Sequence, residues 1–244
     1  MTAAALTDRS IVAHASSRAH HAIEQRRSQT LVTICEAEIE RMIFDGELER
    51  GMRINELTLA ARLGVSRGPL REACRSLAQA GLLDIRANRG FFVRKLEHKE
   101  VVDLYDLRAG LMRLAGEAIA RRIRPEQLAG LRERLGALDA ACARGDVLRF
   151  QQLNVEFHAA LVEAADNARL QSIYTGLDKE LRLFRRRGLG SGPALEAANR
   201  EHHAIVEAIA SRDPARAGAM MEAHILQGKE RFLAAAGGEL DEQG

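Results

Sequence analysis

The segment from Arg62 to Val93, RLGVSRGPLREACRSLAQAGLLDIRANRGFFV, constrains the fold of this chain most strongly. Its turn residues and apolar positions predict a helix end, a tight turn, a second helix and a β-hairpin. Asn55 can cap the short first helix, and Gly64 can end it because glycine adopts the left-handed conformation at little cost. On this helix we expect one apolar face made of Leu57, Ala60, Ala61 and Leu63.

The second helix of this segment is predicted to begin after Ser66, which can serve as its N-cap. Pro69 fits the first turn, where its missing N–H has no helical partner. The apolar spacing predicts a buried stripe of Leu70, Ala73, Cys74 and Leu77. The three arginines at 67, 71 and 75 are four residues apart and therefore share another flank of the helix.

A β-hairpin is predicted to follow, with strands at residues 82–86 and 91–94. Asn88 and Gly90 can supply the positive φ angles of its turn, which places Arg89 at the tip. Residues 50–95 hold ten Lys or Arg and three Asp or Glu, a net charge of +7, although the whole chain carries only +2. Such a local basic block favours phosphate, so the pattern indicates a winged helix-turn-helix that binds duplex DNA.

Over about residues 30–95 the chain resembles the winged helix-turn-helix of GntR-family transcriptional regulators. The resemblance is carried by Ile39, Gly46, the run GMRINEL at 51–57, the pattern VSRxPxREA at 65–73 and the wing residues Asn88-Arg89-Gly90.

By this resemblance Arg67 and Arg71 contact bases or adjacent phosphates, and Ser66 contacts a phosphate. Arg89 and Gly90 would lie at the minor groove. The predicted DNA-binding set is Arg53, Ser66, Arg67, Gly68, Arg71, Arg75, Arg89 and Gly90. Gly68 stands where the family usually has threonine, so one hydroxyl-to-phosphate contact is lost.

Composition limits the class of protein. A chain of 244 residues that is 46% hydrophobic can bury a sizeable core and has room for two domains. It lacks the run of roughly 18 apolar residues that a membrane span requires, and we expect a cytoplasmic protein. Cys35, Cys74 and Cys142 are far apart and odd in number, so we expect core positions rather than disulfides. With 4% aromatic residues and no Trp, the chain favours duplex DNA over single strands.

After Lys95 the pattern is almost wholly helical and predicts six antiparallel helices with short connections. The expected fold class is mostly α: an N-terminal winged helix-turn-helix domain followed by an all-helical antiparallel bundle. The expected parts are a mobile arm at 1–27, a DNA-binding domain at 28–95, an effector-binding and dimerisation domain at 96–237 and a disordered tail at 238–244.

Polar residues on inward stripes of this bundle suggest a binding site. Asn154 and His158 are four residues apart and share a helix face. His202 lies eleven residues before Asp213 and His224 eleven after it, so a helical hairpin that turns there brings the two histidines level. Neutral imidazole is a common ligand of Zn and Ni, and the cluster predicts a divalent metal site. The alternative is a set of core histidines that are each satisfied by a hydrogen bond.

Arg108 follows Val101, Leu104 and Tyr105 on an apolar stripe, so its guanidinium needs an anionic partner. Either an internal carboxylate or a bound ligand must supply that charge. A metal with an open position beside Arg108 would hold a small carboxylate, with the metal on one oxygen and the guanidinium on the other.

Over about residues 97–235 the chain resembles the helical ligand-binding domain of the fatty-acid-regulator (FCD) branch of the GntR family, in its metal-binding form. The resemblance is carried by VDLYDLR at 102–108, NxxFH at 154–158, Asp166-Asn167, Glu201-His202, and Asp213 with Ala217 and His224. It implies an ion held by one Asp and three His.

Two positions depart from that family pattern. Asn154 stands at the Asp position, and an amide is a weaker ligand than a carboxylate. Met112 stands where relatives often place Glu, which would leave Arg108 freer for a ligand.

We therefore expect a homodimeric, ligand-responsive transcription factor, a repressor of a metabolic operon rather than an enzyme. It would bind a palindromic operator whose half-sites lie about one helical turn apart. A metal-dependent hydrolase that uses His158, His202 and His224 is the alternative, although no Glu or Asp is convincingly placed as its general base. An architectural DNA binder is a third possibility, for which a ligand pocket would be superfluous.

Overall fold

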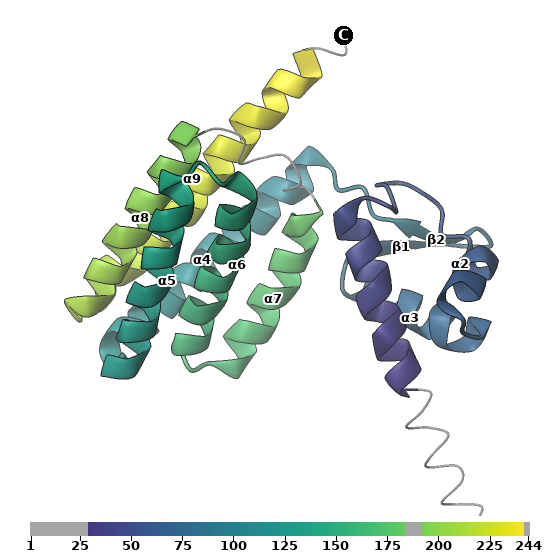
Figure 1. Ribbon diagram of the computed structural model, residues 1–244, viewed down its shortest axis with the longest axis horizontal. Helices are drawn as coiled ribbons and strands as arrows, with labels where there is room; N and C mark the ends of the chain where they lie inside the picture. The colour runs from purple at the N-terminus through teal and green to yellow at the C-terminus, as the bar shows by residue number, and fades with distance from the viewer. Residues whose placement is uncertain (1–28, 184–191, 242–244) are drawn as a thin grey trace, which may run out of the picture. The chain divides into compact units, whose positions relative to one another are not determined.

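The structure is a computed structural model that describes residues 29–183 and 192–241 (Figure 1). The chain divides into two compact units, Met1–Lys95 and Leu96–Gly244. The predicted arm at 1–27 lies outside the described residues. In the described part of the chain, no helix has both the length and the apolar character needed to cross a membrane.

The described part of the first unit contains three helices and a β-hairpin. The first helix spans residues 29–45. Helix α2 (Glu56–Leu63) and helix α3 (Arg67–Gln79) follow, and the hairpin consists of β1 (Leu83–Arg86) and β2 (Gly90–Val93). The predicted winged helix-turn-helix is confirmed by this order of elements.

Helix α2 begins and ends as its residues predict. The Asn55 side chain accepts hydrogen bonds of 3.1 Å from two N–H groups of the first turn, and Gly64 adopts a φ of 65° after the last turn. The predicted apolar face is right for Ala60, which is buried, but wrong for Leu57, which is 68% exposed, and it omits Leu59, which is buried. The core side of this short helix is therefore set by the packing of α2 against α3 and not by the position of its first leucine.

Ser66 occupies the N-cap position of α3 in an extended conformation, but its side chain makes no capping hydrogen bond. The prediction of a Ser66 cap is therefore wrong in this detail. A capping serine accepts from the N–H of the second or third helical residue, and the third residue here is Pro69, which has no N–H. The Ser66 side chain lies exposed at the start of the helix.

The hairpin forms the predicted wing. Its antiparallel register places Leu83 opposite Val93 and Arg86 opposite Gly90. Asn88 has a φ of 58° and Gly90 a φ of 89°, which confirms the predicted positive φ angles of the turn. The backbone of Arg53 forms an additional antiparallel bridge to Phe92 and ties the segment before α2 to the wing.

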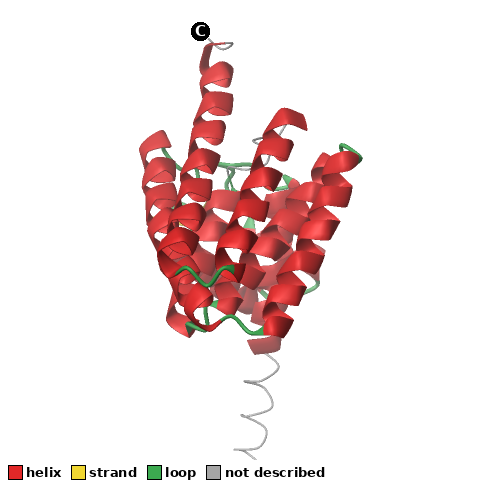
Figure 2. Cartoon of the chain, turned by 90° about the vertical axis from the view of Figure 1, so that its left-hand side faces the viewer, coloured by secondary structure: helices red, strands yellow, loops and turns green. Residues whose placement is uncertain are grey.

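The described part of the second unit is built of helices. They are α4 (His98–Arg122), α5 (Pro125–Ala143), α6 (Val147–Ala164), α7 (Ala168–Arg182), α8 (Gly192–Ala210) and α9 (Pro214–Asp241). Figure 2 shows these helices packed side by side, as the six-helix prediction requires. Helix α9 continues to Asp241, through residues 238–241 that the sequence assigns to a tail.

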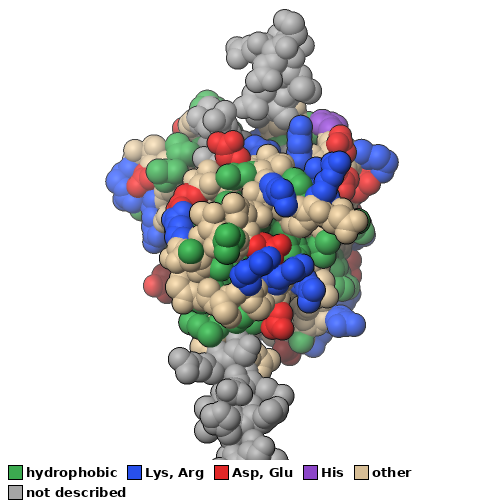
Figure 3. Space-filling view, turned by 90° about the vertical axis from the view of Figure 1, so that its right-hand side faces the viewer, with side chains coloured by type: hydrophobic (Ala, Val, Ile, Leu, Met, Phe, Trp, Pro, Cys, Tyr) green, Lys and Arg blue, Asp and Glu red, His purple; other side chains and the backbone are tan. Residues whose placement is uncertain are grey.

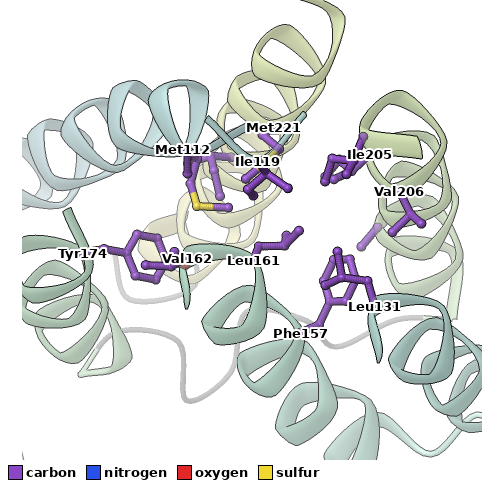
Figure 4. Packing of buried hydrophobic residues seen from close by; sticks show 14 of the residues in the cluster. Met112, Ile119, Leu131, Phe157, Leu161, Val162, Tyr174, Ile205, Val206 and Met221 are labelled. Carbon is purple, nitrogen blue, oxygen red and sulfur yellow. The ribbon is translucent and has the colours of Figure 1, made fainter. Parts of the chain in front are cut away.

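The core of the second unit is centred on α6. Phe157 and Leu161 of this helix are fully buried. Figure 4 shows them beside Ile119 of α4, Leu131 of α5 and Ile205 of α8. This apolar packing fixes the rotation of α6 and α8 about their axes, and therefore the direction in which their polar residues point.

Helices α4 and α9 approach each other closely at two glycines. A Cβ atom on Gly116 would lie 2.7 Å from the carbonyl oxygen of Ala217 and 2.8 Å from the sulfur of Met221. A Cβ atom on Gly218 would lie 2.8 Å from Cγ of Glu117. The absence of side chains at these two positions allows the helix backbones to pack together.

Gly116→Ala is expected to lower the free energy of unfolding of the second unit by about 1–3 kcal/mol, because the added methyl meets backbone atoms. Gly136→Ala in the exposed part of α5 is the matched control, since nothing lies within 4 Å of its Cβ position. That control is expected to stabilise by about 0.5–1 kcal/mol, because alanine favours helix over glycine. Urea unfolding of both variants tests the packing, and similar effects of the two changes would contradict it.

Candidate functional site

Three histidines from three helices meet inside the second unit. His158 of α6, His202 of α8 and His224 of α9 each place a ring nitrogen within 4.8 Å of the others. All three are buried, and His202 is 0% exposed. The predicted helical hairpin does bring two of them level, because the ring centroids of His202 and His224 lie 4.7 Å apart.

The tautomer of His224 follows from its neighbours. Its Nδ1 lies 2.6 Å from the Glu201 carboxylate, which accepts hydrogen bonds when ionised, so Nδ1 carries the proton and Nε2 presents a lone pair. That Nε2 lies 3.0 Å from Nε2 of His158, at hydrogen-bonding distance. Two nitrogens bound to one Zn ion at about 2.0–2.1 Å would be separated by roughly 3.3 Å, so the spacing is close to that of a shared metal.

Glu201 is held in turn by Arg231. The two terminal guanidinium nitrogens donate to the two carboxylate oxygens at 2.6 and 2.9 Å. Burial raises the pKa of Glu201, but the hydrogen bonds from His224 and Arg231 outweigh it and hold the pKa below its ordinary value. The carboxylate therefore stays ionised and fixes the orientation of the His224 ring.

His202 is the clearest sign that a ligand belongs here. Neither of its buried ring nitrogens has a hydrogen-bond partner among the described residues, and the side chain lies beside Phe150 and Phe157. Burial lowers the pKa of His202 well below its ordinary value, so the ring is neutral. A buried, neutral imidazole without a partner is costly unless a cation or another polar ligand accepts its lone pair, and the residues present therefore fit a divalent ion.

A cavity of about 70 Å³ opens beside the histidines and is lined by His158, His224, Asn154, Arg108 and Arg231 among others. The predicted fourth ligand, Asn154, thus faces the same space as two of the imidazoles. Its side chain is half-buried. The cavity brings together three of the four predicted ligands and two guanidinium groups, and His202 is not among its lining residues.

Arg108 is 3% exposed, as its position on an apolar stripe predicts. Its charge has an internal partner, because a terminal nitrogen lies 3.3 Å from the carboxylate of Asp178. Its Nε also donates to the hydroxyl of Tyr174 at 3.1 Å. Of the two partners that the sequence leaves open for Arg108, the structure therefore shows an internal carboxylate, which comes from α7.

The predicted DNA-binding residues lie at the surface of the first unit. The side chains in this set are all exposed and Gly90 is half-buried. Space around the Cβ position of Gly68 is open, with nothing within 4 Å. Figure 3 shows Lys and Arg side chains in several groups over the face in view, some with acidic side chains beside them.

Arg71 has an acidic neighbour that the sequence pattern did not reveal. Its Nε lies 3.2 Å from Oε2 of Glu56, whose side chain is only 14% exposed. Glu56 also lies under the wing, since a Cβ atom on Gly90 would be 3.6 Å from its Oε1. The contact is made through Nε, and the Arg71 side chain remains 47% exposed.

The sequence analysis assigns no supporting role to five residues that hold these sites in place, although Glu201 is part of a motif that it quotes. They are Glu56, Tyr174, Asp178, Glu201 and Arg231. Each acts through a partner that is distant in sequence, such as Arg231, thirty positions after Glu201. A useful signal was present for Arg231, because it is a charged residue that follows His224 by seven positions and so shares its helix face.

Comparisons with known proteins agree with this architecture. The family model described as bacterial regulatory proteins, gntR family, matches residues 34–93, and the FCD domain model matches residues 103–227. The Nta operon transcriptional regulator of Aminobacter aminovorans is 34% identical over 75% of this chain and 85% of its own length. A probable D-xylose utilization operon transcriptional repressor of Paenarthrobacter nicotinovorans is 32% identical over 75% of this chain and 80% of its own length.

Solved structures share the fold. McbR/YncC of E. coli superposes with a TM-score of 0.72 at 21% sequence identity, covering 84% of this chain and 98% of that chain. A putative GntR regulator from Rhodococcus sp. RHA1 gives a TM-score of 0.68 at 24% identity and covers 84% of this chain and 98% of its own.

Glu201→Gln is expected to lower the free energy of unfolding by about 1–3 kcal/mol, because it leaves the Arg231 charge without its anion in a largely buried place. Glu196→Gln on the same helix is the control. Its carboxylate lies 3.9 Å from Arg200 and both side chains are more than 60% exposed, so the change is expected to stay within about 0.5 kcal/mol. Thermal and urea unfolding measure the stability of the two variants. Equal losses in the free energy of unfolding would show that Glu201 does not stabilise the site.

Proposed function

Because the chain belongs to the GntR family of bacterial regulatory proteins and carries an FCD domain, we propose that it represses a metabolic operon under the control of a small carboxylate. The histidine cluster beside two cavity-lining arginines supports this proposal most directly. In this proposal the first unit reads operator DNA in the cytoplasm, and the second unit binds the effector that changes operator affinity.

The DNA contacts are assigned from exposure and charge. Arg67, Arg71 and Arg75 lie four residues apart on α3 and are exposed, so α3 would enter the major groove with these side chains toward bases and phosphates. Glu56 would hold Arg71 through Nε, so that the two terminal nitrogens can bind one base edge or phosphate as a pair. Ser66 would contact a phosphate with Gly68 beside it, Arg53 a neighbouring phosphate, and Arg89 with Gly90 the minor groove.

His158, His202 and His224 would hold a divalent ion, with Asn154 as a fourth, weaker ligand. Zn or Ni fits neutral imidazole donors best. Bound there, the ion would offer a Lewis-acidic position to one carboxylate oxygen of the effector. Arg108 lies on the same cavity and would bind the effector through a second oxygen.

A homodimer would place two DNA-binding units on one operator and so give a sequence specificity that a single small unit lacks. Helix α4 carries an apolar stripe of Leu104, Leu107, Leu111 and Leu114, in which Leu107 is 61% and Leu114 49% exposed. Two copies of such a stripe can pair about a two-fold axis and bury it. A two-fold dimer would match a palindromic operator.

A hydrolase is less well supported. Glu201 is the acid nearest to the histidine cluster, and its oxygens accept hydrogen bonds from both Arg231 and His224. A carboxylate occupied in this way is poorly placed to take a proton from water. The arrangement suits binding of an anion and does not supply the general base that hydrolysis needs.

Selection of duplexes from a random library with the full chain tests the function. We expect enrichment of one palindrome, bound with an affinity that falls steeply as salt rises, because several phosphates are neutralised. Failure to retain any duplex at low ionic strength would overturn the proposal.

Arg67→Ala is expected to relax base preference and to cost about 1–3 kcal/mol of binding to the selected operator, because a contact to a base edge is lost. Arg89→Ala is expected to weaken binding to specific and random duplexes by similar factors. Fluorescence anisotropy with both duplexes separates the two effects. Equal losses for both variants on both duplexes would contradict the assignments.

His202→Ala is expected to weaken binding of Zn or Ni by at least about tenfold, since one ligand is removed. His203→Ala is the control, because this next residue is exposed and its Nε2 lies 2.8 Å from Asp139, away from the cluster. Competition against a coloured chelator measures the affinity. An unchanged affinity in His202→Ala would rule out the histidine site.

A further inference from the structure

The wing of the first unit has one face that does not belong to the core. Leu83, Phe91 and Val93 are buried in the first unit. Side chains alternate between the two faces along a strand, and residues that are paired across two strands share a face. Asp84 and Phe92 are paired in the register, so both lie on the face opposite to the buried residues, which we call the outer face of the wing.

Two arginines lie on this outer face with Phe92. Arg53 pairs with Phe92 in the backbone bridge and therefore shares its face. Arg86 follows Asp84 by two residues on β1 and so points to the same side. Its guanidinium carbon lies 4.1 Å from the centroid of the Phe92 ring. The outer face therefore holds an arginine that is stacked on an aromatic ring.

The charges of these arginines are not neutralised within the described part of the chain. Arg53 and Arg86 are exposed, while Asp84 and Phe92 are half-buried. Neither arginine forms an ion pair with an acid in residues 29–183 and 192–241, although Asp84 lies on the same face. Two unpaired cations on one exposed surface favour binding of an anion such as phosphate.

The contact with Phe92 prepares Arg86 for such an anion. Stacking on the ring restricts a long side chain before it meets a ligand, so less conformational entropy is lost on binding. A guanidinium that stacks through its face keeps its N–H edge for hydrogen bonds, and that planar edge matches two oxygens of one phosphate. In the described part of the chain, the N–H groups of Arg86 make no hydrogen bond to another residue.

We infer that Arg86 is a further DNA contact of this protein and binds a backbone phosphate, and that Phe92 orients its guanidinium for this contact. The inference rests on the proposed function and adds a residue pair to it. Arg86 is three residues before Arg89 on the same hairpin, so a wing tip at the minor groove would bring it to the adjoining sugar–phosphate backbone. Arg53, on the neighbouring strand, would bind a phosphate next to it.

Fluorescence anisotropy of the full chain with the selected operator and with a random duplex, over a range of salt concentrations, tests this contact. Arg86→Ala removes the charge, and Phe92→Leu keeps the charge but removes the ring. The double variant shows whether the ring acts through the arginine. Arg62→Ala is the matched control, because the Arg62 side chain is 54% exposed and lies 2.6 Å from Glu47.

Arg86→Ala is expected to weaken binding to both duplexes by similar factors of at least about threefold, and to reduce the salt slope by about one, because one phosphate contact is lost. Phe92→Leu is expected to weaken binding to both by at least about twofold with an unchanged salt slope, since the charge remains. In the Arg86→Ala background the same change should alter the affinity by less than about 1.5-fold. Arg62→Ala should bind both duplexes like the unaltered chain.

Unchanged affinity and salt slope in Arg86→Ala would overturn the inference and leave the proposed function intact. A loss confined to the operator would mean that Arg86 contacts a base edge, which contradicts the phosphate assignment. If Phe92→Leu has the same effect with and without Arg86, the ring only supports the fold of the wing and its orienting role is wrong. Failure of the unaltered chain to bind any duplex would instead overturn the proposed function itself.

Discussion

Three imidazoles buried at one point are the constraint on which the second unit depends. They lie on α6, α8 and α9, so their convergence requires the apolar core around Phe157 and Leu161 to set the rotation of these helices. Glu201 accepts hydrogen bonds from both Arg231 and His224, so one ring nitrogen of His224 has a partner. His202 remains without a partner among the described residues, and this unmet requirement is what a bound cation would satisfy.

The geometry of the first unit depends mainly on local capping and turn residues. Asn55 and Gly64 fix the ends of α2, and Asn88 with Gly90 turns the wing. On this scaffold the arginines of α3 are exposed, as the proposed DNA contacts require. Glu56 lies next to Arg71 and restrains it, and the surrounding surface keeps its other arginines.

Much of this architecture could be predicted from sequence, since caps, glycines and apolar spacing are local signals. The buried His158, His202 and His224 could be predicted too, because each sits on an apolar stripe and Asp213-Pro214 fixes the hairpin. What could not be predicted depends on packing between distant segments. Asp178 lies on a different helix from Arg108, the exposure of Leu57 depends on how α2 meets α3, and the loss of the Ser66 cap follows from the exact position of Pro69.

In our proposal the helical unit binds a small anion, and this binding changes the affinity of the first unit for DNA. The most direct measurement is the dissociation constant of the full chain for its selected operator, by fluorescence anisotropy at fixed salt, as succinate is added in the presence of Zn. We expect a change of at least tenfold that is absent in Arg108→Met and absent when Zn is removed by a chelator. An operator affinity that stays constant across a series of small carboxylates with Zn present would contradict it.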